Sequence, residues 1–410
     1  MKPIIQSLLD LDFYKLTMAQ LAWRLHREVP VRYGFTNRTK KVRLADTVPI
    51  EVLRDELAHV RTLRPTAEEI GYLRESRHVP RGLFGEDFLK FFEGVRLPEV
   101  EIETTPNGQY RLETAGSWPE AIFWETIVLC VVNELYYRFR SWTERADPAA
   151  VRREGDRRLG EKIALLKARP EALFIEFGTR RRYSAENQAL VTERLADEAP
   201  WQIIGTSNVH LAKRFGLAPK GTMAHETFMI YAGICGATDV GLRDSHNRVL
   251  RDWWDLYGAP MSLALTDTYG SGFFFRDFTP EQARSWKGLR QDSGDPFAFG
   301  ERQIAFYEGL GIDARGKLFV PSDGLDMPLF LKLVERFSGR IQVCGGIGTN
   351  LSNDVGYPSL SLVMKAIEAG GRPLVKLSDN PAKATGPAGE VGRYKRVFAY
   401  EEGVYQECKS

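Results

Sequence analysis

From about residue 170 onward, short apolar runs alternate with longer amphipathic stretches. Six runs share one form, in which an apolar segment ends in Gly, Thr, Ser or Asp and a helical pattern follows. In order they are ALFIEFGTRR, WQIIGTSN, SLALTDTYG, GLRQDSGD, KLFVPSDG and IQVCGGIGTN. Strands that alternate with helices predict parallel βαβ units, and continuous apolar runs are typical of strands buried on both faces. The pattern favours an α/β barrel, with an open doubly wound sheet as the alternative.

The first 110 residues mix both periodicities. Residues 12–26 repeat apolar side chains at helical intervals, and residues 31–38 then alternate between apolar and polar positions as a strand does. Residues 100–116 fit a β-hairpin, because Asn107 and Gly108 supply a tight turn between two alternating segments. The chain therefore begins with an α+β arrangement and continues as α/β.

Length and charge limit the classes of function. The 410 residues, of which 43% are hydrophobic and 27% charged, can build a large barrel together with a second domain. The formal net charge is only +2, which gives no general attraction to nucleic acid or to a membrane surface. A binding site for an anion must then be built locally.

No segment has the pattern of a signal peptide or a membrane span. Residues 121–137 form the most apolar long stretch, but it contains Glu125, Asn133 and Glu134 and is too short to cross a bilayer. A buried helix is expected there. The four cysteines are scattered without a CxxC spacing, which is typical of free thiols in a reducing compartment. We therefore expect a cytoplasmic protein.

Residues that suit anions and planar ligands gather where the predicted strands end. Arg180, Arg181 and Arg182 directly follow the first strand, and guanidinium groups bind carboxylates or phosphates through paired hydrogen bonds. Phe177, the last apolar residue before them, can face an aromatic ligand. Because the carboxyl ends of such strands face the ligand, we expect these side chains near the site. A solvated run of charges remains the alternative for the arginines.

Acidic residues follow three of the later strands. The segment RQDSGDP places Arg290, Asp292 and Asp295 in one turn, and Asp267 and Asp323 follow two other strands. Such carboxylates can hold ribose hydroxyls or magnesium. The same residue types also form an ordinary N-cap and turn, so each turn alone leaves both interpretations open.

The segment GGIGTN, residues 345–350, offers consecutive backbone N–H groups with little side-chain obstruction, as a phosphate cradle requires. It matches neither a Walker A loop nor GxGxxG, but phosphate sites near the last strands of a barrel are common. Together the strand ends fit a ligand with a planar group, an acid, a ribose-like polyol and phosphates. A nucleotide-forming or sugar-phosphate enzyme is the class that these features indicate.

The segment GTMAHE places His225, one of only six histidines, beside Glu226. Imidazole changes charge near neutral pH and is a good nucleophile, so a proton shuttle, a metal ligand and a phosphate acceptor are all consistent with it. A buried histidine with only a structural role is equally consistent, and the segment alone leaves the choice open.

Ten segments occur in the order found in nicotinate phosphoribosyltransferases, which this sequence resembles from residue 10 to about residue 385. They are DFYKLTMAQ, SWPEAIFWETIVLCVVNE, FIEFGTRRRYS, GTSNVHLAKRFG, GTMAHE, LTDTYG, GLRQDSGDP, PSDG, GIGTN and VKLSDNPAK. No single segment is specific, but EFGTRR, GTxAHE and RxDSGD together are highly specific. The bacterial form of the family has about this length.

The resemblance implies a type II phosphoribosyltransferase fold, an irregular α/β barrel with an N-terminal α+β domain. We place the N-terminal domain at residues 1–120, completed by residues 380–410, and the barrel at residues 121–379. Members of this family join nicotinate to phosphoribosyl pyrophosphate with Mg²⁺, forming nicotinate mononucleotide and pyrophosphate for NAD biosynthesis. ATP is a co-substrate, and its hydrolysis drives the reaction through a phosphohistidine.

The resemblance also implies roles for single residues. His225 corresponds to the phosphorylated histidine, and Tyr14 and Phe177 correspond to the aromatic pair that encloses the pyridine ring. The remaining implied roles are contacts to nicotinate and the phosphoribosyl group (Arg180, Thr222, Arg290), carboxylates near ribose and magnesium (Asp267, Asp292, with Asp295 as a further candidate metal ligand) and a cradle for the 5′-phosphate (Gly346, Gly348, Thr349). Family active sites form across a dimer interface, so the resemblance implies a homodimer in which the partner subunit supplies Tyr14.

The nearest alternative substrates are nicotinamide and quinolinate. Relatives that use the amide carry Asp where this chain has Ser207, and a buried Asp would accept a hydrogen bond from the amide and repel a carboxylate. Ser207 therefore favours the acid. Quinolinate enzymes are shorter and lack GTMAHE. The alternative from another class is an inactive barrel that binds nucleotides as a regulator, and the intact His225, Arg180, Arg290 and Asp292 speak against it.

Overall fold

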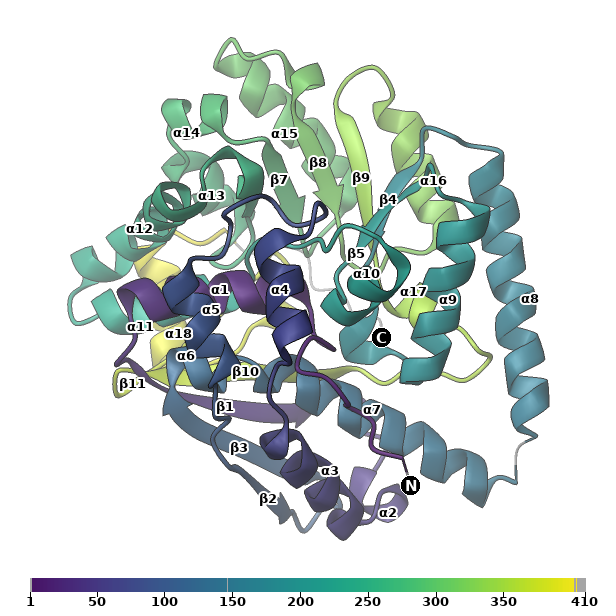
Figure 1. The fold of residues 1–410 in the computed structure, drawn as a ribbon. Coiled ribbons are helices and arrows are strands. Elements are labelled where there is room, and N and C mark those ends of the chain that lie inside the picture. The colour runs from purple at the N-terminus through teal and green to yellow at the C-terminus, as the bar shows by residue number, and fades with distance from the viewer. Residues whose placement is uncertain (1, 146, 402, 404–410) are drawn as a thin grey trace.

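A computed structural model describes residues 2–145, 147–401 and 403 and contains two sheets (Figure 1). One is a six-stranded parallel sheet with the order β5-β4-β9-β8-β7-β6, and the other a five-stranded antiparallel sheet with the order β11-β10-β1-β3-β2. The parallel sheet lies in the upper half of Figure 1, the antiparallel sheet lies at the lower left, and α1 runs between them. The predicted class, an α/β domain with an N-terminal α+β domain, is confirmed.

All six apolar runs that predict parallel strands form strands. They are β4 (Leu173–Glu176), β5 (Ile203–Thr206), β6 (Leu263–Leu265), β7 (Gly288–Gln291), β8 (Leu318–Pro321) and β9 (Gln342–Ile347). Each strand pairs in parallel with its neighbour, which places all six carboxyl ends at one edge. The runs contain no polar alternation because helices cover the outer face and a mostly apolar interior fills the inner one.

Over the described residues, the ladder of hydrogen bonds does not join β5 to β6. The segment 217–222 lies at this opening instead. Thr206 at the end of β5 forms an isolated parallel bridge with Pro219, and the Thr222 hydroxyl donates to the Leu263 carbonyl of β6 at 2.9 Å. One irregular segment thus contacts both edge strands, and it leads directly into the helix that begins at His225.

Helices connect the parallel strands and cover them. They are α8 (Pro148–Lys167), α9 (Ala185–Glu198), α10 (Val209–Phe215), α11 (His225–Cys235), α12 (Asp239–Tyr257), α13 (Ser271–Asp277), α14 (Pro280–Ser285), α15 (Pro296–Gly309), α16 (Met327–Phe337), α17 (Thr349–Ser352) and α18 (Ala388–Val397). Side-chain caps fix several starts, for example Asp326, whose carboxylate accepts the Leu329 N–H.

The N-terminal elements follow the predicted mixture. They are α1 (Phe13–Leu25), β1 (Pro30–Asn37), α2 (Leu44–Thr47), α3 (Ile50–Thr62), α4 (Ala67–Glu75), α5 (Glu86–Glu93), β2 (Val100–Thr104), β3 (Tyr110–Ser117), α6 (Trp118–Ala121) and α7 (Trp124–Thr143). The predicted hairpin turns at Gly108, whose φ of 72° suits glycine. The apolar stretch forms a buried helix, α7, and none of the described helices is both long and apolar enough to cross a membrane.

The chain returns to the N-terminal sheet earlier than predicted. The strands that complete it are β10 (Leu362–Ala369), which pairs antiparallel with β1, and the short β11 (Arg372–Pro373). β10 alternates between buried and half-buried positions, as a strand over a core does. Of the predicted segment 380–410, α18 packs against α12 of the parallel-sheet domain instead, and residues 402 and 404–410 lie outside the described residues.

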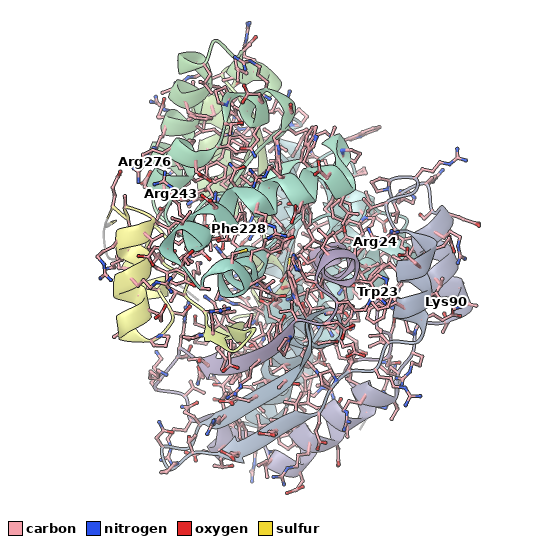
Figure 2. All side chains as sticks on the ribbon, turned by 90° about the vertical axis from the view of Figure 1, so that its left-hand side faces the viewer. Trp23, Arg24, Lys90, Phe228, Arg243 and Arg276 are labelled. Atoms are coloured by element: carbon pink, nitrogen blue, oxygen red, sulfur yellow. The ribbon has the colours of Figure 1, made fainter. Side chains whose placement is uncertain are left out.

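Two sets of contacts hold α1 between the domains. On one side, Phe13 donates its N–H to the Ser207 carbonyl, and a buried Asp10 carboxylate binds the Arg182 guanidinium at 2.6 and 2.8 Å. On the other side, Figure 2 shows Trp23 at the end of α1 beside α5, where it stacks on Phe91 with ring centroids 4.2 Å apart. The start of α1 is therefore fixed against the carboxyl ends of β4 and β5.

Candidate active site

A cavity of about 440 Å³ lies where the carboxyl ends of the parallel strands meet α1, α11 and β10. Ten of the predicted site residues line it: Tyr14, Phe177, Arg180, Thr222, His225, Arg290, Asp292, Gly346, Gly348 and Thr349. They come from segments spread over more than three hundred residues of sequence. The edge of the sheet predicted to face the ligand is therefore where the structure brings them together.

Two parallel aromatic rings form one wall of the cavity. The Tyr14 and Phe177 rings lie 6.4 Å apart between centroids, with an angle of 6° between their planes. A flat ring inserted between two others needs roughly 7 Å, which is two van der Waals contacts. Gly221, with φ of 141°, borders both rings, and a Cβ there would lie 3.2 Å from the Tyr14 nitrogen and 3.5 Å from Phe177 Cζ. The rings and this glycine form a slot close to the width of one planar ring.

Both rings of this slot belong to one chain. Tyr14 is only 1% exposed and contacts Phe177 within the same subunit, so the expectation that a partner subunit supplies Tyr14 is wrong for this structure. The physical reason is the antiparallel contact of residues 9–13 with residues 207–210, which holds α1 against its own barrel. The homodimer itself stays a prediction, and a dimer is not needed to complete the slot.

A buried glutamate shapes the loop that carries Phe177 and Arg180. The Glu176 carboxylate is fully buried and accepts hydrogen bonds from the Gly178 N–H at 2.7 Å, the Thr206 hydroxyl at 2.6 Å and the Gln188 amide. These donors surround both carboxylate oxygens. These hydrogen bonds hold the loop after β4 in place, and with it the Phe177 side of the slot.

The three consecutive arginines have three different roles. Arg180 lines the cavity, with Nη1 3.2 Å from the Glu125 carboxylate and Nε 3.5 Å from Asp12. Arg181 also lines the cavity, and burial together with the charges of Arg180 and Arg38 lowers its pKa to about 10. Arg182 points away and pairs with Asp10, as described above. Two of the arginines can thus meet an anionic ligand, and the third holds the fold.

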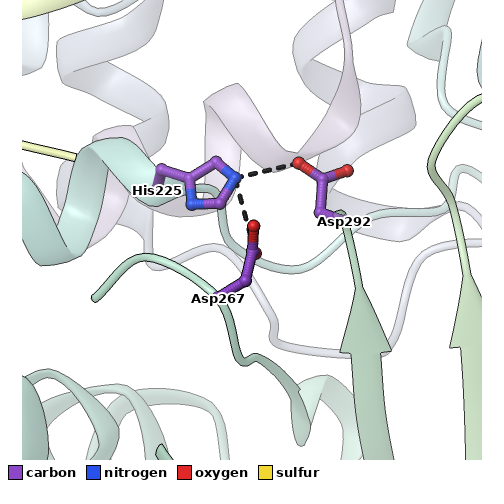
Figure 3. Close-up of side chains that lie close together, drawn as sticks. All are labelled: His225, Asp267 and Asp292. Atoms are coloured by element: carbon purple, nitrogen blue, oxygen red, sulfur yellow. Dashed lines mark hydrogen bonds and ion pairs between the residues drawn. The ribbon is translucent and has the colours of Figure 1, made fainter. Parts of the chain in front are cut away.

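His225 begins α11 and faces two aspartates (Figure 3). Its Nε2 lies 2.8 Å from Asp292 Oδ2 and 3.7 Å from Asp267 Oδ1, and its Nδ1 lies 3.0 Å from the Thr268 hydroxyl. Burial and the nearby Lys376 charge lower the pKa of His225 to about 4, against the opposite effect of the aspartates. The imidazole is therefore neutral at pH 7. An ionised carboxylate only accepts, so Nε2 carries the proton and Nδ1 keeps its lone pair.

This low pKa predicts a pH dependence of stability. An unfolded His225 has a pKa near 6.5, so between pH 6.5 and about 4 the unfolded chain binds a proton that the folded chain does not, and stability falls as the pH falls. From pH 7 to pH 5 this loss is about 2 kcal/mol. Urea unfolding at both pH values should show that His225→Asn loses about that much less stability than the wild type. Equal losses in both proteins would contradict the prediction.

Arg290 and Asp292 extend from the end of β7 into the same cavity. Arg290 donates to the Ser322 hydroxyl at 3.1 Å and to the Met223 carbonyl at 3.3 Å, and its Nη2 lies 3.3 Å from Asp292 Oδ1. Burial alone would raise the pKa of Asp292, but Arg290 and the His225 hydrogen bond hold it well below its usual range. Asp292 is therefore ionised and presents a fixed negative charge to the cavity.

Asp267 lies behind His225 and does not line the cavity. Its Oδ2 accepts hydrogen bonds from the Ser293 and Ser378 hydroxyls, at 2.5 and 3.2 Å. Its Oδ1 is buried, faces His225 and accepts no hydrogen bond from any of the described residues. The ligand atoms of His225, Asp267 and Asp292 all lie within 4.8 Å of one another. Two carboxylates, one of them with an unused oxygen, fit a hard divalent cation better than the imidazole nitrogen does.

The glycine-rich segment after β9 lines the far side of the cavity. A Cβ on Gly348 would lie 2.7 Å from the Phe177 carbonyl, so this glycine allows the loops after β4 and β9 to touch. Gly346 lies 3.1 Å from Ser322 by the same measure. Asp323, which also lines the cavity, binds Lys383 Nζ at 2.6 Å. The segment predicted as a phosphate cradle is thus in the cavity, beside a lysine.

Besides Asp267, two more predicted site residues, Asp295 and Ser207, do not reach the cavity. Asp295 is an exposed N-cap of α15, with its carboxylate accepting the Ala298 N–H at 2.7 Å, and so the ordinary turn interpretation of this residue is correct. Ser207 is fully buried, and its hydroxyl donates to Asp12 Oδ1 at 2.6 Å behind the cavity wall. Ser207 therefore acts on a ligand only through Asp12 and Arg180.

The contact with Asp12 changes what is expected of Ser207→Asp. The new carboxylate would face the buried Asp12 carboxylate, whose ion pair with Arg180 is a long one at 3.5 Å, and a second buried negative charge there should destabilise the fold by about 3 kcal/mol or more. The matched variant Ser207→Ala only loses a hydrogen bond, at a cost of about 1–2 kcal/mol. Urea unfolding at pH 7 and pH 5 tests this, because sharing one proton should relieve the Asp pair at the lower pH. A stable Ser207→Asp protein at pH 7 would contradict it.

Several residues of the cavity carried no clear signal in the sequence. Besides Arg180, Arg181 and Arg290, six cationic side chains of the described residues line it: Arg38, Lys220, Lys287, Lys365, Lys376 and Lys383. Burial, together with the charges of Lys376 and Arg38, holds the pKa of Lys365 well below its usual value. Lys376 and Lys383 lie in VKLSDNPAK, a segment with no recognisable chemistry of its own, and Lys365 lies in a strand of the other sheet. Only the three-dimensional fold places these charges together.

Comparison with known proteins agrees with this arrangement. The model of the nicotinate phosphoribosyltransferase (NAPRTase) family matches residues 172–402, and that of its N-terminal domain matches residues 9–133. The solved nicotinate phosphoribosyltransferase of Vibrio cholerae is 36% identical, over 98% of this chain and 95% of that chain, with a TM-score of 0.88. That of Porphyromonas gingivalis is 31% identical, over 97% and 100%, with a TM-score of 0.87.

The chain therefore has the two-domain α/β fold of a family of transferases. In this fold, the N-terminal and the C-terminal parts of the chain both supply residues of the site. This chain belongs to the nicotinate phosphoribosyltransferase family.

Proposed function

We propose that this protein transfers a phosphoribosyl group from phosphoribosyl pyrophosphate to nicotinate, forming nicotinate mononucleotide and pyrophosphate, and that ATP hydrolysis drives the transfer through a phosphohistidine. The observation that carries the proposal is one cavity that joins an aromatic slot, a neutral histidine between two aspartates and a cluster of cations. Nicotinate phosphoribosyltransferases of known structure with the same fold support the choice of substrate.

The aromatic slot is the proposed site of the pyridine ring. A planar heterocycle between Tyr14 and Phe177 would gain stacking on both faces, and Arg180 at the edge of the slot carries the charge that a pyridine carboxylate needs. The Arg180 guanidinium carbon already lies 5.9 Å from the centre of the Tyr14 ring. An acid is thus a better match to this end of the cavity than a neutral amide.

The cation cluster is the proposed site of the phosphates. Burial lowers the pKa of Lys365 and of Lys376, and repulsion by neighbouring cations, among them Arg38, lowers both further. A polyanion such as pyrophosphate would relieve this repulsion, so part of the binding energy comes from charges that the empty cavity holds at a cost. The backbone of the Gly346–Thr349 segment would take the 5′-phosphate.

The transfer itself needs stabilised charges rather than a covalent intermediate. The bond from ribose C1 to the pyrophosphate oxygen breaks, its electron pair leaves with the pyrophosphate, and the pyridine nitrogen forms the new bond to C1. Positive charge develops on C1 and the ring oxygen during this step. The ionised Asp292 faces the cavity and can stabilise that charge, while Arg290 can stabilise the leaving group.

Asp292 and Asp267 are the residues that would hold Mg²⁺, since their carboxylate oxygens lie within 4.8 Å of each other and Asp267 Oδ1 accepts no hydrogen bond within the part of the chain that the structure describes. Bound there, Mg²⁺ would neutralise part of the charge of the substrate phosphates. Asp323 lies in the same cavity but is already paired with Lys383, so it is a weaker candidate.

The coupling to ATP is proposed to pass through His225. A ring nitrogen takes the γ-phosphoryl group, ADP leaves, and the phosphoramidate is later hydrolysed to the free histidine and phosphate. A nucleophile needs an unprotonated nitrogen, which the lowered pKa of His225 provides at pH 7. The phosphoryl group would add a charge of about −2 next to the cation cluster and could order it for the sugar phosphate.

Turnover of nicotinate, nicotinamide and quinolinate, measured in parallel with and without ATP, tests the proposal. We expect pyrophosphate release with nicotinate at a kcat/KM about 100-fold above that with nicotinamide, a difference of about 2.7 kcal/mol, and stimulation by ATP. Comparable values for acid and amide would overturn the choice of substrate. No pyrophosphate release with any of the three would indicate a nucleotide-binding regulator instead of an enzyme.

A further inference from the structure

A lysine without contact to the cavity lies at the centre of a buried charge cluster. The Lys15 side chain is completely buried, and its Nζ lies 2.5 Å from Glu125 Oε2 and 2.6 Å from Glu226 Oε2. Glu226 Oε1 also accepts hydrogen bonds from the Tyr33 hydroxyl at 2.7 Å and the Trp118 indole at 3.0 Å. Lys15 therefore joins α1, α7 and α11 at one point.

The two glutamates connect Lys15 to both ends of the cavity. Glu125 Oε1 binds Arg180 Nη1 at 3.2 Å, so one carboxylate is shared between Lys15 and Arg180. Glu226 directly follows His225 in the first turn of α11. Both glutamates line the cavity, whereas Lys15 does not, so Lys15 can influence a ligand only through them.

The ion pairs of Lys15 and Arg180 explain how Lys15 can affect the binding of an anionic ligand. Arg180 pairs with the carboxylates of Glu125 and Asp12, and Lys15 pairs with those of Glu125 and Glu226. Lys15 thus supplies one of the two positive charges that these ion pairs bring to Glu125, and without Lys15 the Glu125 carboxylate is paired with Arg180. Burial alone would raise the pKa of Glu125, but Lys15 and Arg180 lower it, so its charge is present at pH 7 and must be shared between them.

We propose that Lys15 is a positioning residue that sets the preference for an acid over an amide: by binding Glu125 it leaves Arg180 enough free charge to hold a carboxylate in the aromatic slot. This rests on the proposed function, since it assumes that the slot holds a pyridine. Lys15 Nζ lies 5.5 Å and the Arg180 guanidinium carbon 5.9 Å from the centre of the same Tyr14 ring, so the ion pairs that join Lys15 to Arg180 through Glu125 border the slot.

A buried charge cluster of this kind is a poor way to stabilise the folded state. Two buried charges lose their hydration, and replacing such a pair by apolar side chains of similar size is often neutral or stabilising. A cluster that only held the fold together would affect acids and amides equally. One that controls Arg180 must affect them differently, and that difference separates the two roles.

Calorimetric dissociation constants for nicotinate and nicotinamide, measured on the full chain, test the proposal with three variants. Lys15→Met should lower the ratio of acid to amide affinity about tenfold, because Glu125 then neutralises Arg180. Glu125→Gln should raise that ratio or leave it at the wild-type value, because Arg180 loses a competitor for the ligand. The double variant Lys15→Met/Glu125→Gln, which removes one charge of each sign, should return to within about threefold of the wild type.

A failure of this inference can be told apart from a failure of the proposed function. If both single variants change the acid and amide affinities by the same factor, Lys15 is only structural and the inference is overturned. If Lys15→Met does not fold, the double variant decides, because a ratio far below that of the wild type would overturn the inference. Wild-type protein that forms no mononucleotide from nicotinate would refute the proposed function, while the affinity ratios would still decide on Lys15.

Discussion

Replacing His225 by Asn is expected to abolish the uptake of acid-labile phosphate from ATP and the stimulation of transfer by ATP. Asn keeps a polar group near Asp292 but has no ring nitrogen to accept a phosphoryl group. A slower transfer that does not depend on ATP should remain, because the aromatic slot and Arg290 are kept and Arg290 still lowers the pKa of Asp292. Labelled phosphate on the protein and ATP-dependent pyrophosphate release measure the two effects.

A second buried histidine supplies the matched control. His246 is 2% exposed and pairs with Asp277 through Nδ1 at 2.7 Å, but it lies among aromatic side chains outside the cavity. His246→Asn should lose stability and keep both the label and the stimulation by ATP. Label that persists in His225→Asn, or that maps to a peptide outside residues 221–235, would mean that His225 is a structural histidine of the kind that His246 represents.

The patterns that predicted the fold are those that depend on local sequence. Each parallel strand is a short apolar run followed by a polar turn and a helix, so its existence and direction could be predicted from the letters alone. The return of β10 to the N-terminal sheet was placed too late because LVMKAIEA contains two charged residues and resembles a surface segment. Its pairing with β1 is set by a partner more than 300 residues away.

The residues of the site also fall into two groups, those that the local sequence predicts and those that depend on packing between distant segments. Residues that follow strands, such as Arg180 and Asp292, were predictable, because parallel strands bring their carboxyl ends together. Ser207 also follows a strand, yet its side chain lies behind the cavity wall and contacts Asp12. The apolar pattern of a strand does not predict in which direction the side chain of the first residue after the strand points. Lys365 lines the cavity from β10, and Lys15 on α1 lies behind the cavity wall; the positions of both elements depend on packing between the domains.

The subunit that supplies Tyr14 also depends on packing that the sequence pattern does not reveal. The family resemblance predicted its role but not which subunit supplies it, since that depends on how residues 9–13 pair. In this chain they pair with residues 207–210 of the same barrel, and the Asp10–Arg182 ion pair reinforces that choice. A few hydrogen bonds at the start of α1 therefore decide whether one chain or two are needed for a complete slot.

Replacing Gly221 by Val is expected to remove nicotinate binding, with a loss of affinity of about 100-fold or more. The Val methyl groups would extend from a Cβ that already lies 3.2 to 3.5 Å from Tyr14 and Phe177, so they would occupy the space between the rings. Phosphate uptake by His225 should persist, because the slot takes no part in it. Calorimetry with nicotinate and labelling with ATP measure the two effects separately.

The positive φ of Gly221 means that any side chain there also strains the backbone, and Gly216 allows that strain to be measured alone. Gly216 has φ of 66° at the end of α10, and a Cβ there meets nothing within 4 Å. Gly216→Val should cost about 1–2 kcal/mol of stability and leave nicotinate binding unchanged. If both variants weaken binding to the same degree, backbone strain is responsible. The space between Tyr14 and Phe177 would then not be where the pyridine ring binds.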